Sequence, residues 1–193
     1  MTHQEIIDSL IAGNKKFVEE KAEGKLRDQE RIQELRNGQD PKIIVLSCAD
    51  SRVVPELAFD KGLGELFVVR VAGNIANTDS IASIEYAVAH LGSTVIVVLG
   101  HENCGAVTAA VNGGDNGYNL NHLLCQITPA VEAAEEGADV NQVVKINAKL
   151  NAEQLVERSS IIAKAVVSGT VKIVPAYYNL SDGSVDFHLE PTV

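Results

Sequence analysis

Two short clusters of reactive side chains follow apolar runs in this sequence. Residues 48–52 read CADSR directly after IIVLS, and residues 101–104 read HENC directly after VIVVLG. A thiol, a carboxylate and a guanidinium together are a poor filling for a core, because a buried ionised group must be paired or hydrated. Thiolate and imidazole are ligands that zinc prefers, and a carboxylate is an optional further one. The two clusters therefore predict a metal site.

Both clusters stand at the carboxyl end of a predicted strand. In an open parallel sheet these ends lie along one edge, where ligands bind, so Cys48, Asp50, His101 and Cys104 can converge although they are far apart in the chain. The spacing of His101 and Cys104 is weak evidence by itself, and the second cluster at the same edge supports it. Three protein ligands would leave a fourth position for water, as in catalytic zinc sites.

The order of elements predicts how these ends are brought together. Four runs rich in valine and isoleucine, KIIVLS, LFVVRVAG, TVIVVLG and VKIVPAYY, predict strands, and the first three are apolar enough to be buried on both faces of a parallel sheet. A helical stripe over 78–91 predicts a crossover helix between the second and third strands. Residues 119–136 and 139–167 carry further helical pattern, and AYYNLSDGSVDF predicts a hairpin that turns at Asp182-Gly183.

These elements predict an α/β fold, a single domain with a central, mainly parallel β-sheet flanked by helices and a C-terminal hairpin strand. Residues 3–36 are mostly polar, with apolar positions at helical spacing, and predict helices outside the main sheet. The main apolar positions are Ile6, Ile7, Leu10, Ile11 and Phe17. We expect one domain over 1–193, with an N-terminal helical arm over 1–37 and an α/β core over 42–193.

Composition excludes several classes of protein. The chain has 193 residues, 46% of them hydrophobic, which is enough for one sizeable core. Its net charge of -10 argues against binding to nucleic acid or to an anionic membrane. No run approaches the roughly 20 apolar residues of a membrane helix, and the first residues lack the pattern of a signal peptide. Three cysteines, an odd number, suit metal binding or catalysis in a reducing compartment, so we expect a cytoplasmic protein.

The third cysteine is not among the candidate ligands. Cys125 lies in HLLCQI, on the apolar stripe of a predicted helix. Free cysteine often behaves as a small hydrophobic side chain, so we expect Cys125 in the core.

The paired motif C-x-D-x-R and H-x-x-C resembles the β-class carbonic anhydrases. The resemblance extends to AGNKKF near the start, VVRVAGNIAN after the second strand, the helix over 78–91 and VKIVPAYYNLSDGSVDF near the end. It implies that Cys48, His101 and Cys104 bind one Zn²⁺ per chain, with Asp50 and Arg52 as a catalytic dyad beside it. It also leaves open that Asp50 turns away from Arg52 and becomes the fourth zinc ligand.

The resemblance further implies reversible hydration of CO₂ to bicarbonate and a proton by zinc-bound hydroxide. Hydrolysis of CS₂ or COS on the same fold is an alternative, and a non-catalytic, zinc-stabilised interaction protein is another, against which Asp50 and Arg52 argue. The implied partners are a small-molecule substrate and further copies of the chain, as a homodimer or tetramer, without nucleic acid or membrane. The N-terminal helix would embrace the partner subunit, an arrangement that the apolar stripe from Ile6 to Phe17 fits.

Overall fold

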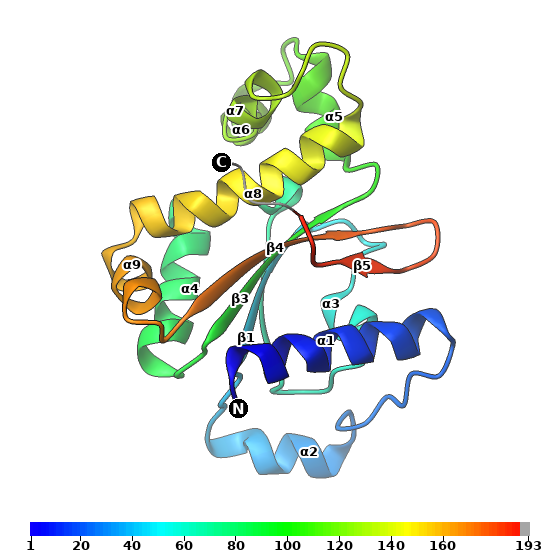
Figure 1. The fold of residues 1–193 in the computed structure, drawn as a ribbon, viewed down its shortest axis with the longest axis vertical. Helices are drawn as coiled ribbons and strands as arrows, with labels where there is room; N and C mark the ends of the chain where they lie inside the picture. The colour runs from blue at the N-terminus through cyan, green and yellow to red at the C-terminus, as the bar shows by residue number, and fades with distance from the viewer. Residues whose placement is uncertain (190–193) are drawn as a thin grey trace.

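The computed structural model describes residues 1–189, which form layers of helices around one sheet (Figure 1). The strands are β1 (Ile43–Ser47), β2 (Leu66–Arg70), β3 (Val95–His101), β4 (Lys172–Tyr178) and β5 (Val185–Asp186). The α-helices are α1 (His3–Val18), α2 (Gln29–Glu34), α3 (Pro55–Ala58), α4 (Thr78–His90), α5 (Gly105–Asn112), α6 (Tyr118–Leu124), α7 (Thr128–Glu132), α8 (Val140–Arg158) and α9 (Ser160–Val167). The short 3-10 helices are η1 (Leu35–Asn37) and η2 (Ala72–Asn74).

The sheet confirms the predicted α/β fold. Within residues 1–189 it has five strands in the order β2-β1-β3-β4-β5, and the first four strands are parallel. The short strand β5 returns antiparallel to β4 through the predicted hairpin. Helix α4 makes the crossover from β2 to β3. The carboxyl ends of β1 and β3 are therefore neighbours at one edge of the sheet, as the two clusters of reactive residues require.

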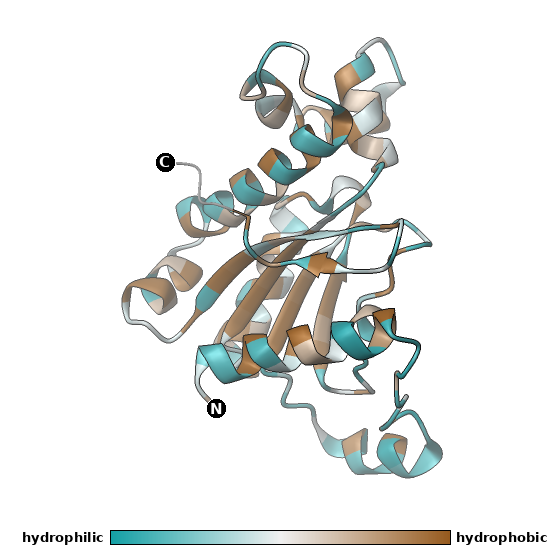
Figure 2. Cartoon of the chain, turned by 45° about the vertical axis from the view of Figure 1, so that its right-hand side comes forward, coloured by the Kyte–Doolittle hydropathy of each residue, from teal (hydrophilic) through white to brown (hydrophobic). Residues whose placement is uncertain are grey.

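Side chains of the central strands alternate between two apolar layers. Ile43 and Val45 of β1 point to the face that α1 covers, whereas Ile44 and Leu46 point to the face that α4, α8 and α9 cover. Strands β1 and β3 are buried along their whole length, and the hydropathy colouring shows the central strands as apolar over most of their length (Figure 2). Burial on both faces explains why these segments read as nearly continuous apolar runs.

Strand β2 departs from the prediction of full burial. Its first four residues are only partly buried and Arg70 is exposed, because β2 is the outer strand of the sheet. Its apolar sequence does not distinguish an outer strand from a central one, since both carry valine and isoleucine on the covered faces.

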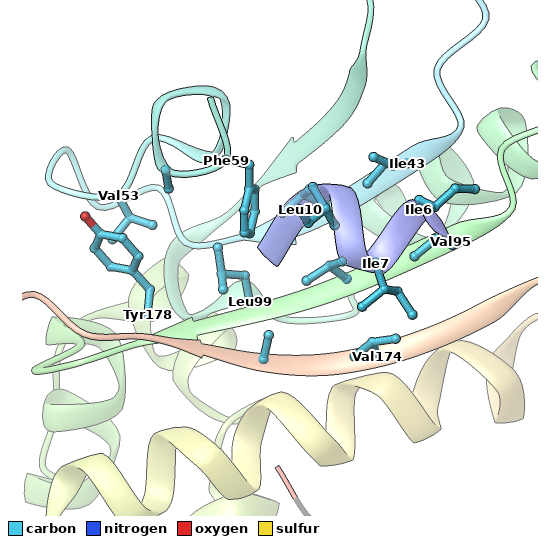
Figure 3. Close-up of a cluster of buried hydrophobic side chains, with 14 residues drawn as sticks. Ile6, Ile7, Leu10, Ile43, Val53, Phe59, Val95, Leu99, Val174 and Tyr178 are labelled. Atoms are coloured by element: carbon cyan, nitrogen blue, oxygen red, sulfur yellow. The ribbon is translucent and has the colours of Figure 1, made fainter. Parts of the chain in front are cut away.

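Helix α1 packs on the sheet of its own chain. Ile6, Ile7 and Leu10 are at most 6% exposed and belong to the same cluster as Val95 and Val174 of the sheet (Figure 3). The expectation that this stripe covers a partner subunit is therefore wrong. The helical spacing identified an apolar face correctly, but it does not show which surface that face covers.

No helix among residues 1–189 is both long and apolar enough to cross a membrane.

Candidate metal centre

Cys48 follows directly after β1 and belongs to a buried cluster with residues of α5 to α8. Its side chain is 4% exposed, and its sulfur accepts a hydrogen bond of 3.3 Å from the backbone N–H of Gly73 in η2. Its carbonyl oxygen accepts a hydrogen bond of 3.0 Å from Nε of Arg70. Cys48 is thus held at its sulfur by the loop after β2 and at its backbone carbonyl by the end of β2.

His101, the last residue of β3, is fully buried with one ring nitrogen available. Its Nδ1 lies 2.9 Å from the carbonyl oxygen of Glu102, and a carbonyl can only accept, so Nδ1 carries the proton. Nε2 then presents a lone pair, and it has no hydrogen-bond partner among the described residues. A buried polar atom without a partner is costly, unless a ligand binds it.

Cys104 caps the amino end of α5 and is also fully buried. Between His101 and Cys104 the chain reverses at Asn103, whose φ of 51° is in the left-handed region. The N–H of Asn103 donates to Oδ1 of Asn141 in α8 at 2.8 Å, which holds this reversal in place. The reversal allows two residues three positions apart to point toward one another.

The structure brings the three predicted ligands together. The sulfur atoms of Cys48 and Cys104 and a ring nitrogen of His101 lie within 4.8 Å of one another, and all three residues are buried. Two thiolates and an imidazole are a donor set that zinc binds, and the unpartnered Nε2 fits this use. The residues therefore fit a bound metal ion.

The electrostatics of the two thiols also favour a bound cation. Hydrogen bonding with Cys104 lowers the pKa of Cys48 well below its usual range, assisted by His101 and by the N–H groups of Gly73 and Asp50. Hydrogen bonding with Cys48 and burial raise the pKa of Cys104. Two neighbouring thiolates repel each other, so only one ionises readily unless a cation lies beside both.

Asp50 and Arg52 form a forked ion pair next to this cluster. Arg52 donates from Nε to Oδ1 at 2.9 Å and from Nη2 to Oδ2 at 2.7 Å, and its backbone N–H also donates to Oδ1. The guanidinium holds the pKa of the Asp50 carboxyl well below its usual value. Oδ2 of Asp50 lies 3.8 Å from Nε2 of His101, so the carboxylate approaches the candidate ligand His101 while it remains paired with Arg52.

Several residues that support the site have no motif in the sequence. Arg70 donates to the carbonyl oxygens of Cys48, Asp50 and Val53, which fixes the loop that carries the first cluster. Asn141, Asn147 and Asn151 of α8 donate to or accept from the backbone of two loops around the site. The sequence shows only that Asn147 and Asn151 are four residues apart and so lie on one face of a helix, which does not indicate what their amides contact.

The prediction that Cys125 lies in the core is wrong. It is exposed at the end of α6, and its thiol donates to the carbonyl oxygen of His122 at 2.9 Å. Helix α6 is short and presents its apolar side through Leu124 instead. Among residues 1–189 the three cysteines form no disulfide.

Comparison with known proteins agrees with this geometry. The family model described as carbonic anhydrase matches residues 43–185. A carbonic anhydrase of Mycolicibacterium smegmatis is 38% identical over 92% of this chain and 89% of its own length. Carbonic anhydrase 2 of Mycobacterium tuberculosis (strain CDC 1551 / Oshkosh) is 36% identical over 91% of this chain and 87% of its own length.

Solved structures with the same fold are β-carbonic anhydrases. The Coccomyxa enzyme in complex with acetazolamide aligns with a TM-score of 0.75 and 25% identity, over 93% of this chain and 84% of that one. A tetrameric β-carbonic anhydrase of Sordaria macrospora, at 24% identity, aligns with a TM-score of 0.75 over 98% of this chain and 100% of that one. From its sequence, its sheet and the matched family model together, this chain belongs to the carbonic anhydrase family and has the fold of its β class.

Proposed function

We propose that this carbonic anhydrase depends on one zinc ion held by Cys48, His101 and Cys104, and that it interconverts CO₂ and bicarbonate there. The observation that carries the proposal is the state of His101: its Nδ1 is fixed on a carbonyl oxygen, and its buried Nε2 faces two sulfurs. Such a set of three ligands leaves one position of tetrahedral zinc for the reaction.

Zinc, when bound, lowers the pKa of a water molecule so that hydroxide is available near neutral pH. The protein must then orient this nucleophile toward an uncharged substrate. Asp50 as a carboxylate can only accept hydrogen bonds, so it accepts the O–H of the nucleophile and leaves a lone pair aimed at the carbon of CO₂. Arg52 keeps Asp50 ionised and in this orientation through its forked pair.

The alternative role of Asp50 as fourth zinc ligand needs a rotation of its side chain. That rotation would break the two hydrogen bonds from the Arg52 side chain, which are charge-assisted and parallel. We therefore propose the orienting role as the active arrangement and the ligating role as a competing one.

The experiment compares substrates on the zinc-loaded chain. Initial rates are measured by stopped flow with CO₂ and, at the same concentration, with COS. We expect CO₂ hydration to be faster than COS hydrolysis. Faster COS hydrolysis would favour the alternative enzyme, and full zinc content without either activity would indicate a structural zinc.

We also propose that the chain acts as a homodimer or tetramer in the cytoplasm. A tetrameric relative with the same fold supports assembly, although α1 uses its apolar face within its own chain. Two buried cysteines that serve as ligands require a reducing compartment to stay unoxidised, which supports the cytoplasm. Light scattering should give two or four times the mass of one chain, and a monomer at micromolar concentration would contradict the assembly.

A further inference from the structure

The loop after β2 connects α8 to the sulfur of Cys48. Gly73 donates its N–H to the sulfur of Cys48 at 3.3 Å, and its carbonyl oxygen accepts a hydrogen bond of 2.9 Å from Nδ2 of Asn147. One residue of the loop therefore contacts a candidate metal ligand on one side and a side chain of α8 on the other.

The amide of Asn147 is itself fixed by a second amide. Asn151 donates from Nδ2 to Oδ1 of Asn147 at 3.0 Å and accepts the N–H of Ala76 at 2.6 Å, and both asparagines are 1% exposed. The N–H of Ala76 can only donate and the carbonyl of Gly73 can only accept. These two ends determine which way each amide points, so the chain of hydrogen bonds has a single direction.

The loop has an uncommon backbone conformation. Gly73 has φ of 72° and the next residue, Asn74, has φ of 43°, so two consecutive residues adopt the left-handed conformation. Glycine and asparagine are the residue types that adopt this conformation most readily, which explains their presence here. A Cβ at Gly73 would lie 2.7 Å from Cδ1 of Ile127, so the position is also packed closely.

We propose that Asn147 is a positioning residue that holds Gly73 so that its N–H donates to the sulfur of Cys48. A hydrogen bond to a thiolate withdraws negative charge from the sulfur, which lowers its donation to a metal ion and leaves the metal the stronger Lewis acid. The same bond fixes the direction of the sulfur lone pairs before the metal binds. Helix α8, remote in sequence from all three ligands, thereby controls the metal centre. The inference depends on the proposed ligation of zinc by Cys48.

The experiment uses Asn147→Ala and measures an absorption band that depends on the cysteine sulfur bound to the metal. In the Co²⁺-substituted protein, sulfur-to-metal charge transfer gives an absorption band in the near ultraviolet. Loss of the N–H···S bond raises the energy of the sulfur lone pair, so we expect this band to move to longer wavelength. In a competition titration with a chromophoric chelator, we expect zinc to bind about 10-fold more weakly, at the lower end of the range for outer contacts of metal ligands, because the lost orientation of the sulfur outweighs its stronger donation.

A matched control distinguishes a positioning role of Asn147 from a general destabilisation of α8. Leu155 is a fully buried side chain of the same helix in the layer against the sheet, so Leu155→Ala destabilises α8 by opening a cavity. We expect a lower melting temperature for this variant, with the wild-type band and zinc affinity. If the band and the zinc affinity of Asn147→Ala equal those of Leu155→Ala, the proposal is overturned.

A second variant covers the case in which Asn147→Ala does not fold. Asn151→Ala leaves the Asn147 amide in place but frees its orientation, so we expect a smaller shift of the band in the same direction. A wild-type band in folded Asn151→Ala would then overturn the proposal. Absence of a thiolate band in the Co²⁺-substituted wild type would instead refute zinc ligation by cysteine, which is a failure of the proposed function.

Discussion

Asp50 has one carboxylate and two neighbours that compete for it. Arg52 holds it through a forked pair, while Nε2 of the candidate zinc ligand His101 lies 3.8 Å from its Oδ2. Asp50 is largely covered, with a side chain 15% exposed, whereas Arg52 is 53% exposed. An ion pair with an exposed guanidinium contributes little to the free energy of folding. The main effect of this pair is therefore to orient the carboxylate of Asp50.

Replacement of Arg52 should slow turnover without emptying the metal site. We expect Arg52→Ala and Arg52→Lys each to lower kcat/KM for CO₂ by about 10- to 100-fold, the range for contacts that orient a metal site. Lysine preserves the charge but cannot reproduce the fork, so it should not rescue the activity. Zinc content, measured by mass spectrometry, should remain at one per chain. Wild-type kcat/KM in both variants would show that Arg52 has no part in catalysis.

The ionisation of Asp50 gives a prediction about pH. Because Arg52 lowers the pKa of Asp50 below its ordinary value of 3.8, the ion pair adds stability at every pH above 3.8. That contribution disappears only as pH falls through the lowered pKa. We expect the ¹³C resonance of the Asp50 carboxyl to stay constant from neutral pH down to about pH 4. In Arg52→Ala the midpoint of the Asp50 titration should move to higher pH. A midpoint above pH 3.8 for Asp50 in the wild type would contradict the pairing with Arg52.

At this scale the sequence predicts the candidate metal ligands and misses the residues that support them. Cys48, His101 and Cys104 could be predicted because their types are unusual at strand ends. Asn147 and Arg70 could not, because asparagine and arginine are common and their partners are backbone atoms distant in sequence. The exposure of Cys125 was missed because an apolar stripe on a short helix does not fix which residues it buries.

Among the elements, α8 does most to organise the site. Its asparagines contact the loop between His101 and Cys104 and the loop after β2. It can do so because it packs very closely on β3: a Cβ at Gly100 would lie 2.9 Å from Cγ1 of Val144 and 3.3 Å from its carbonyl oxygen. The absence of a side chain at Gly100 therefore sets the distance between helix and strand.

Substitution of Gly100 tests this packing. We expect Gly100→Ala to lower the free energy of unfolding by about 1–3 kcal/mol, because the added methyl group must displace the α8 backbone. The matched control is Gly38→Ala, where a Cβ meets no atom within 4 Å and φ of 169° suits any residue. Urea denaturation of both variants measures the difference. Equal stability of Gly100→Ala and the wild type would show that α8 is packed less closely.

The order of strands and helices followed from periodicity, but the contacts between elements did not. The four parallel strands, the crossover helix and the final hairpin all form as predicted. The apolar stripe of α1 was assigned to a partner, whereas it covers Val95 and Val174 of its own sheet. The apolar stripe of an amphipathic helix shows that one face is buried. Only the three-dimensional packing shows which surface buries it.

The whole molecule combines a net negative charge with a buried candidate metal centre, the one such group found among residues 1–189. Its net charge of -10 does not impede an uncharged substrate such as CO₂, which needs no electrostatic guidance. The family match covers residues 43–185, a range that contains all three candidate ligands, both residues of the dyad and all of α8. The central claim is therefore that one zinc ion at this centre makes the chain an active carbonic anhydrase.

The most direct test is the initial rate of CO₂ hydration as zinc is added stepwise to the metal-free chain. We predict a rate that rises linearly and reaches its plateau at one zinc per chain. Cys125→Ser, which changes an exposed cysteine, should reproduce this curve, whereas Cys104→Ser, which changes a buried candidate ligand, should remain far below it. A full rate before zinc is added, or the wild-type curve in Cys104→Ser, would contradict the account.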